Sequence, residues 1–310
     1  MQEERTSRII VAFLRRAVVF VALTVTGPAF GDSITLVPDA DTSLFANFPD
    51  NNLGASISLV AGGNGAGLPG RALLHFDLSG QVPSNAVIQS VALTVNVVMA
   101  PGGGGVSSIF DLHRLLVGWV EGTGTGNTGS PANDGEPTWT DRVYPSVAWT
   151  APGGAVSNEF SATVSSTMLI NGLGGYTFPA TPTLVADLQQ WLLNPATNFG
   201  WILISESENT PFTARRFGAR EDPVSTSVLQ IQYALPTAPE FQWIKPIAGG
   251  IQLGFLAAAE QPYTVQYRDS LGAAGWMTLT NIVPQSAATN VIVTDSATTS
   301  AQRYYRIGAF

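Results

Sequence analysis

Short apolar runs, each ended by Gly, Pro, Asn or Asp, recur along the chain from Ile34 onwards. The clearest run lies within 87–99, where Val91, Leu93 and Val95 alternate with smaller or polar residues. A period of two residues is typical of a strand with one buried face. Strand-length runs separated by turn-forming residues predict an all-β fold.

The same pattern gives the expected strands. In the first two thirds of the chain we expect them at 33–37, 56–61, 71–77, 87–99, 109–116, 200–205 and 228–233. In the last 70 or so residues we expect them at 251–256, 263–268, 276–279, 290–293 and 303–307.

One helix is expected between Pro182 and Asn194. Pro182 suits the first turn of a helix, and Asn194-Pro195 ends it. Its apolar side chains recur at helical spacing and should close one end of a β-sandwich; they are Leu184, Val185, Leu188, Trp191 and Leu192.

The N-terminus predicts export. Four arginines precede the apolar run 17–25, and Ala29 and Gly31 supply the small residues that a signal peptidase requires. This pattern predicts a signal peptide over residues 1–31, cleavage before Asp32 and export through the Sec pathway to the cell surface or the extracellular space. The alternative, an uncleaved anchor, would need about 20 apolar residues, and Gly27-Pro28 interrupts the run before that length.

Composition narrows the classes of partner and chemistry. The formal net charge of −8 makes the surface repel phosphate backbones, so nucleic acid is not an expected ligand. Cysteine is absent, which excludes disulfides, thiolate metal sites and a cysteine nucleophile. A secreted protein of this kind must draw its stability from its core and sheet closure, and from calcium if calcium is bound.

Two domains are expected. The Pro-containing segment 235–241 reads as a short, semi-rigid linker. It separates a first domain at 32–234 from a second all-β domain at 242–310, and no internal repeat relates the two.

Catalytic residues are sparse. The only histidines are His75 and His113, both in expected strands, and no Gly-x-Ser-x-Gly elbow is present. Paired carboxylates such as Glu206 and Glu208 occur where turns ordinarily collect acids. We therefore expect no enzyme, with a glycoside hydrolase as the third-ranked alternative.

The first turn is rich in oxygen ligands: Asp39, Asp41, Asp50 and Asn52. Calcium takes six to eight oxygens from carboxylates, amides and carbonyls, so these residues are candidate ligands for a structural calcium ion. The alternative is that they satisfy local backbone groups, as Asp and Asn often do in turns.

Two tryptophans and three arginines are the candidate ligand-binding residues. Trp139 and Trp149 follow the long polar loop 122–137 and could stack on sugar rings, although core packing is the commoner use of tryptophan. Arg215, Arg216 and Arg220 form the one basic cluster after the signal segment. Arginine forks bind carboxylates in a bidentate manner, whereas surface ion pairs with nearby acids are the alternative.

A set of short motifs over residues 36–233 resembles the secreted β-sandwich modules called DNRLRE domains, grouped with carbohydrate-binding module family 96. The motifs that carry the resemblance are Asp41-Thr42-Ser43-Leu44, Asn51-Asn52-Leu53-Gly54, Arg71 to Leu78, Val91 to Val95, Leu188 to Trp191, Asn198-Phe199-Gly200 and Leu229 to Tyr233. The second domain, with Tyr263 to Leu271, Trp276 and Tyr304 to Arg306, resembles the fibronectin-III-like modules of bacterial secreted proteins.

The resemblance implies a jelly-roll-like β-sandwich with one short helix, followed by a small fibronectin-III-like β-sandwich. It also implies non-catalytic binding of a polysaccharide or cell-surface glycan, with an acidic polymer among the candidates. A structural or adhesive component of the cell surface or matrix is the rival class, and no membrane insertion is expected after signal cleavage.

Overall fold

The computed structural model describes residues 31–235, 239–259, 261–270, 272, 275–296 and 302–309. The chain divides into two compact units, and the division falls between Leu235 and Pro236. The expected signal peptide, apart from Gly31, lies outside the described residues. Within the described part of the chain, no helix has both the length and the apolar character needed to cross a bilayer.

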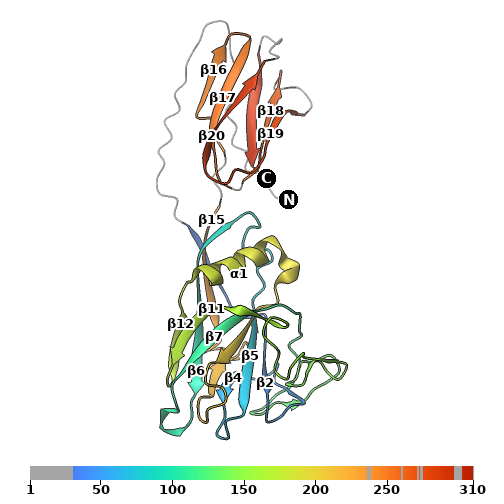
Figure 1. Cartoon of the computed structure of the whole chain (residues 1–310), viewed down its shortest axis with the longest axis vertical. Helices are drawn as coiled ribbons and strands as arrows, with labels where there is room; N and C mark the ends of the chain where they lie inside the picture. Colours follow the sequence, from blue (N-terminus) through green and yellow to red (C-terminus); the bar gives the residue numbers. More distant parts are fainter. Residues whose placement is uncertain are drawn as a thin grey trace. The chain divides into compact units, whose positions relative to one another are not determined.

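The first unit is an antiparallel sheet that curls on itself (Figure 1). In the described residues it has nine strands in a hydrogen-bonded row and two that branch from it. The row runs β1 (Asp32–Leu36), β15 (Val228–Ala234), β6 (Val87–Met99), β14 (Arg215–Gly218), β4 (Ser58–Gly63), β5 (Pro69–His75), β13 (Trp201–Ser205), β7 (Ser108–Leu115) and β11 (Phe160–Ile170). The branches are β12 (Gly174–Phe178) on β6 and β2 (Ala40–Phe45) on β5.

The core lies inside the curl. Val91, Leu93 and Val95 of β6 are buried as their alternation predicts. Opposite them, Trp201 packs on Phe76 with ring centroids 6.1 Å apart in an edge-to-face arrangement. Each large apolar side chain buried in this way stabilises the fold by about 1.5–3 kcal/mol. The expected all-β sandwich is confirmed.

Helix α1 (Pro182–Leu193) lies over one end of this unit, followed by the short turn η2 (Pro195–Thr197). Thr181 caps it, since its hydroxyl accepts a hydrogen bond of 3.0 Å from the Leu184 amide. Leu184, Leu188 and Trp191 face the core at the predicted spacing. The Gln189 side chain accepts a hydrogen bond of 2.9 Å from the Ile88 amide, which links the helix to the start of β6.

The segment between β7 and β11 forms a lobe of loops beside the sheet (Figure 1). Two small ladders organise it: β3 (Asn51–Asn52) with β8 (Ser130–Pro131), and β9 (Asp141–Val143) with β10 (Val147–Ala148). A separate apolar cluster, which includes Leu44, Leu115 and Trp149, fills the space between this lobe and the sheet.

The second unit has two three-stranded antiparallel sheets in its described residues, with an apolar core shared by both. Leu253 and Phe255 from one sheet pack with Val265 and Ile307 from the other. The expected small β-sandwich is thereby confirmed. Its sheets are β16 (Trp243–Ile247), β17 (Gly250–Ala257) and β20 (Thr289–Asp295), and β19 (Met277–Ile282), β18 (Tyr263–Arg268) and β21 (Tyr304–Ala309).

The start of the second unit differs from the expected domain boundary. Phe241, expected at the end of the linker, is buried in the second core and packs edge-to-face on Phe255 at 6.3 Å. The Gln242 amide also donates to the Gly254 carbonyl at 2.8 Å. Burial of a phenylalanine therefore places the beginning of this unit at or before residue 241.

Candidate functional site

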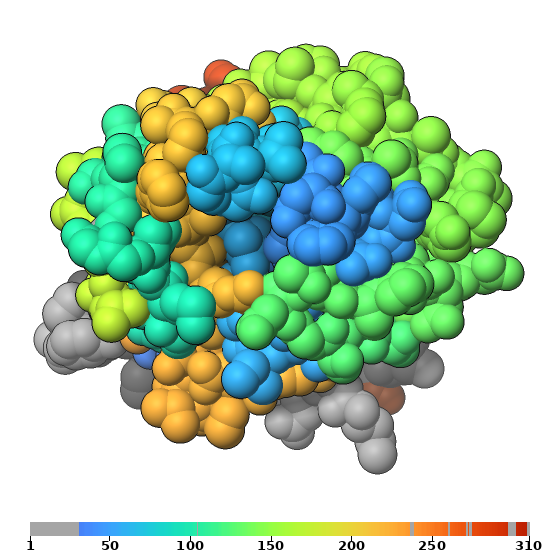
Figure 2. All heavy atoms as spheres, turned by 90° about the horizontal axis from the view of Figure 1, so that it is seen from below, coloured from blue at the N-terminus to red at the C-terminus, as the bar shows by residue number. Residues whose placement is uncertain are grey.

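A groove of about 290 Å³ opens at the end of the first unit opposite α1. Figure 2 views this end and shows the hollow between loops from distant parts of the sequence. Its floor crosses three neighbouring strands, because Arg216 of β14 is paired with Val60 of β4 and with Met99 of β6. Residues paired directly across strands present their side chains on one face of the sheet.

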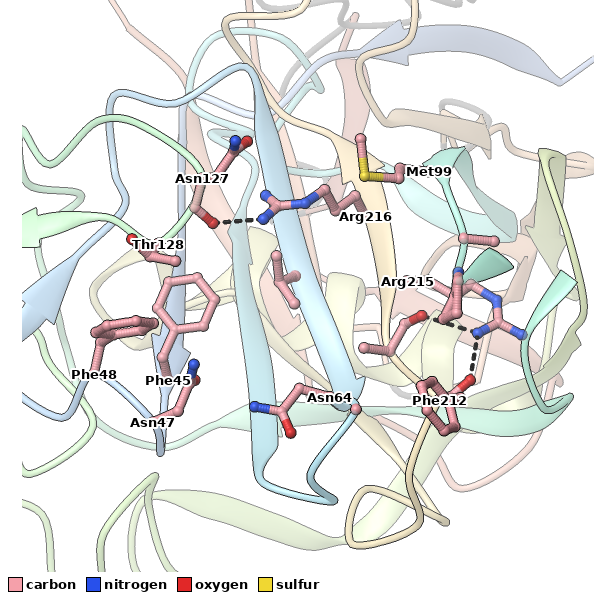
Figure 3. Close-up of a pocket in the computed structure, with 15 residues that line it drawn as sticks. Phe45, Asn47, Phe48, Asn64, Met99, Asn127, Thr128, Phe212, Arg215 and Arg216 are labelled. Carbon is pink, nitrogen blue, oxygen red and sulfur yellow. Dashed lines mark hydrogen bonds between the residues drawn. The ribbon is translucent and has the colours of Figure 1, made fainter. Parts of the chain in front are cut away.

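Exposed aromatic rings stand at the rim. Phe48 is 38% exposed and Phe212 is 52% exposed, while Phe45 beside Phe48 is buried. In Figure 3, Phe45 and Phe48 lie on one side of the groove and Phe212 on the other. Flat rings at the edge of a groove can cover the apolar face of a pyranose, with polar groups between them to fix orientation.

Phe212 has an unfavourable backbone conformation that two hydrogen bonds stabilise. Its φ of 65° lies in the left-handed region, which is rare for a bulky residue. The Phe212 amide donates to the Asn64 carbonyl at 3.1 Å, and its own carbonyl accepts from the Val106 amide at 2.9 Å. Two anchored backbone groups thus fix a conformation that Phe would not adopt freely.

Arg216 supplies a positive charge to the groove. Its guanidinium donates to the Ser58 hydroxyl at 3.2 Å and to the Asn127 carbonyl (Figure 3). Among the described residues no carboxylate forms an ion pair with it. Burial lowers the pKa of the Arg216 guanidinium from the usual arginine value. This direction is expected when a positive charge is partly desolvated and has no negative charge beside it.

Arg215 also borders the groove, but its guanidinium is engaged within the protein. Side chains alternate along a strand, so Arg215 and Arg216 face opposite ways on β14. Arg215 is 1% exposed, and its guanidinium donates to backbone carbonyls around it. They belong to Val106, Asn171, Phe212, Thr213 and Ala214. This residue acts as an internal clamp for the loop that carries Phe212.

The long polar loop 122–137 is ordered and forms part of the groove. Asn127 and Thr128 line it. The loop is held by the Asn51 side chain, which donates to the Thr128 carbonyl at 2.9 Å, and by the Ser56 hydroxyl, which donates to Gly126 at 3.3 Å. The length of the excursion therefore has a structural use at the groove.

The two expected tryptophans do not line the groove. Trp149 is buried and its indole donates to the Thr138 carbonyl at 2.8 Å. Trp139 is half-buried in the loop lobe, where the Arg71 guanidinium lies 5.6 Å from its ring centroid. Both serve the packing between the lobe and the sheet, which is the commoner use of large apolar residues.

Three of the four expected calcium ligands lie apart from one another. Asp39 pairs with His75 at 2.6 Å, and exposed Asp50 accepts from the Thr140 hydroxyl at 3.4 Å. The buried Asn52 side chain forms hydrogen bonds with the backbone: it donates to the Glu121 and Pro137 carbonyls and accepts from the Gly54 and Gly124 amides. These three side chains, placed before β2, in the turn before β3 and on β3, are therefore engaged with different partners and do not form the expected set of metal ligands.

Asp41 instead meets acids from distant loops. A carboxylate oxygen of Asp41 lies within 4.8 Å of one from Glu121 and one from Glu221. Arg220, the third expected arginine, joins this acidic cluster and not Arg216. Its guanidinium grips both Glu121 oxygens, at 2.9 and 2.8 Å, and reaches Glu221 at 2.6 Å.

Electrostatics at Asp41 are strongly perturbed. Burial raises the pKa of the Asp41 carboxyl to about 8, opposed by a hydrogen bond from the Arg220 amide and reinforced by the charges of Glu221 and Glu121. Burial likewise raises the pKa of Glu221.

The expected absence of catalytic machinery stays a prediction. His75 is bound to Asp39, and His113 contacts the Ser161 carbonyl at 2.9 Å. Glu208, one of the paired carboxylates, forms a bidentate pair with Arg71. No pair of described carboxylates lines the groove.

Phe48 and Phe212 were absent from the residues expected to bind a ligand. Both have a proline neighbour in a turn segment, Asn47-Phe48-Pro49 and Thr210-Pro211-Phe212. An aromatic residue in such a segment has no alternating apolar neighbours to bury it with. That local signal is not specific to them, because Trp139 also follows a polar, proline-containing segment, Glu136-Pro137-Thr138.

Neither models of known protein families nor curated proteins give a match to this chain. The fold and the groove therefore carry the functional argument, and the resemblance to DNRLRE domains stays a prediction.

Proposed function

We propose that this protein is an exported, non-catalytic carbohydrate-binding protein that holds a carboxylate-bearing polysaccharide in the groove of its first unit. The observation that carries the proposal is Arg216. A half-buried guanidinium with no carboxylate partner among the described residues is costly unless a ligand supplies one.

The surroundings of Arg216 suit a sugar acid. Phe48 and Phe212 offer apolar faces for the ring, and Asn64, Asn127 and Thr128 offer amide and hydroxyl groups for its oxygens. The groove is open, so a polymer could pass through it without its chain ends being engaged.

Affinity electrophoresis tests this proposal. Purified protein is run through native gels that contain pectate, alginate or a neutral cellulose derivative. We expect retardation by an acidic polymer, and its loss in Arg216→Gln and Phe48→Ala. Two control variants lie off the groove and should be retarded like the wild type: Arg142→Gln removes a half-buried arginine, and Val224→Ala removes an 88% exposed apolar side chain.

The outcomes distinguish the rival functions. Mobility that no polymer changes would contradict polysaccharide binding and favour a structural or adhesive component. Shortening of the polymer during incubation would instead favour a hydrolase.

A further inference from the structure

The acidic cluster of Asp41, Glu121 and Glu221 joins three distant parts of the first unit. Asp41 lies on β2, Glu121 follows β7, and Glu221 follows β14. The backbone reinforces the junction, since the Asp41 amide donates to Glu121 at 2.8 Å and the Arg220 amide donates to Asp41 Oδ2 at 2.7 Å.

Two oxygens in this cluster are buried without a donor. They are Oδ1 of Asp41 and Oε2 of Glu221. The Asp41 side chain is only 1% exposed, so bulk water does not reach it. A buried carboxylate oxygen without a hydrogen bond or counter-ion is strongly unfavourable, and such atoms in native proteins point to an occupant.

The charge of the cluster is not balanced by the protein. Arg220 offsets one of the three carboxylates, which leaves two negative charges if all three are ionised. No other described lysine or arginine forms an ion pair with Asp41, Glu121 or Glu221. A divalent cation would balance the remainder.

We propose that Asp41, Glu121 and Glu221 bind a calcium ion. Calcium–oxygen distances of about 2.3–2.6 Å allow two ligand oxygens of one ion to be up to about 5 Å apart. One carboxylate oxygen of each acid lies within 4.8 Å of the others, inside that span. Magnesium demands near-ideal octahedral geometry and usually keeps several waters, so a cluster of three protein carboxylates suits calcium better.

The ligand roles differ among the three acids. Asp41 Oδ1 and Glu221 Oε2 are free to coordinate directly. Glu121 already accepts from Arg220 and from the Asp41 amide, but a carboxylate has about four lone-pair positions and can also contact an ion. Water could complete the coordination shell on the side of Glu121 and Glu221, whose side chains are partly exposed.

Such an ion would tie strand β2 to two loops. Glu121 directly precedes the loop 122–137, and Glu221 belongs to the turn after β14. In a chain without disulfides this cross-link would add stability to the loop lobe. The proposal rests on the cluster alone and does not depend on polysaccharide binding.

Calorimetric titration of chelator-treated wild-type protein with calcium chloride at pH 8 is the direct test, paired with thermal unfolding. We expect saturable binding of one ion per chain and a higher unfolding midpoint, with a smaller effect of magnesium at equal concentration. Asp41→Asn and Glu221→Gln should each weaken calcium binding by about tenfold or more, as is typical for loss of a charged ligand. The control is Asp50→Asn, which removes an exposed acid of the same region outside the cluster and should bind calcium like the wild type.

Two results would overturn the proposal. One is a wild-type protein that shows no heat of calcium binding and no change of its thermal unfolding midpoint with calcium. That result would mean that protonation, and not a metal ion, neutralises the buried oxygens of Asp41 and Glu221. The other is a calcium response that survives in both cluster variants, which would place the ion elsewhere. The wild-type titration decides the first point even if a variant fails to fold.

Discussion

Phe212 combines a backbone conformation that disfavours Phe with an exposed ring at the groove. Its φ of 65° costs about 1–2 kcal/mol for a non-glycine residue. Strain of this kind is retained where the surrounding structure and the function require the side chain. If Phe212 binds the proposed ligand, its effects on stability and on binding should therefore be separable.

Replacing Phe212 with glycine tests that separation. Glycine adopts positive φ without strain, so Phe212→Gly should keep or raise the free energy of unfolding while lowering affinity for the polysaccharide by several-fold. Urea denaturation and affinity electrophoresis, performed on the same preparation, measure the two effects. A variant that is clearly less stable than the wild type would show that the ring packs for stability, contrary to this account.

Asp41 should give the cation-free protein an unusual pH dependence. Its pKa is about 8 in the folded protein against 3.8 for the ordinary side chain, because of burial. Between these values the folded state holds a proton that the unfolded state lacks, so the stabilising contribution is full below pH 3.8 and is lost as the pH rises through 8. The charged groups that act on this proton are Glu121, Glu221 and Arg220.

The comparison with Asp41→Asn isolates this effect. In chelator, the stability of the wild type relative to the variant should fall from pH 5.5 to pH 8 by up to about 1.4 kcal/mol per pH unit. Chemical denaturation at several pH values gives the difference. A difference that stays constant over this range would mean that Asp41 is ionised throughout.

At the scale of elements, the residue directly before β13 shows how a close approach between two backbones restricts a position to glycine. Gly200 has φ +75°, and a Cβ there would lie 2.0 Å from the Leu74 carbonyl oxygen on β5. Only glycine permits β13 to pair closely with β5 at this point.

Two glycine substitutions distinguish close approach from backbone strain. Gly200→Ala should destabilise the protein by about 3 kcal/mol or more, since both strain and collision apply. Gly80→Ala has a similar φ of +70° with nothing within 4 Å, so it should cost only about 1–2 kcal/mol. Thermal unfolding of both variants measures the difference, and equal losses would contradict the role assigned to the Leu74 contact.

Elements with a regular pattern were predictable from the sequence. The alternation of Val91, Leu93 and Val95 located β6 within its observed bounds, and the apolar stripe and Asn194-Pro195 located α1. Among the strands that were not predicted, which also include β11, β12 and β16, the strands β2 and β14 escape because buried positions hold polar residues, such as Thr42 and Arg215, whose partners come from elsewhere in the fold.

The site was less predictable because it depends on contacts between distant residues. Asp41 lies 80 residues from Glu121 in sequence, yet the Asp41 amide donates a hydrogen bond to the Glu121 carboxylate. No local spacing encodes such a meeting, so the sequence predicts candidate ligands only within a single turn. The sequence predicts Arg216 as a binding residue together with Arg220, but their separation follows only from β14 ending between them.

For the whole molecule, the two separate cores predict two unfolding events. Leu253 is fully buried in the second core and Leu93 in the first. Leu253→Ala and Leu93→Ala should each cost about 2–5 kcal/mol and lower only the transition of their own unit. Differential scanning calorimetry would show this, and a single transition that both variants lower equally would mean that the units unfold together.

We propose that Arg216 selects carboxylate-bearing sugars in the groove. The most direct measurement is calorimetric titration of the wild type and Arg216→Gln with oligogalacturonate and with its fully methyl-esterified form, which differ only in free carboxylates. A charge-assisted hydrogen bond is worth about 1.5–3 kcal/mol, so the wild type should bind the free acid about tenfold or more tightly than the ester. The variant should bind both alike. Equal affinities in the wild type, or a preference that persists in Arg216→Gln, would contradict the account.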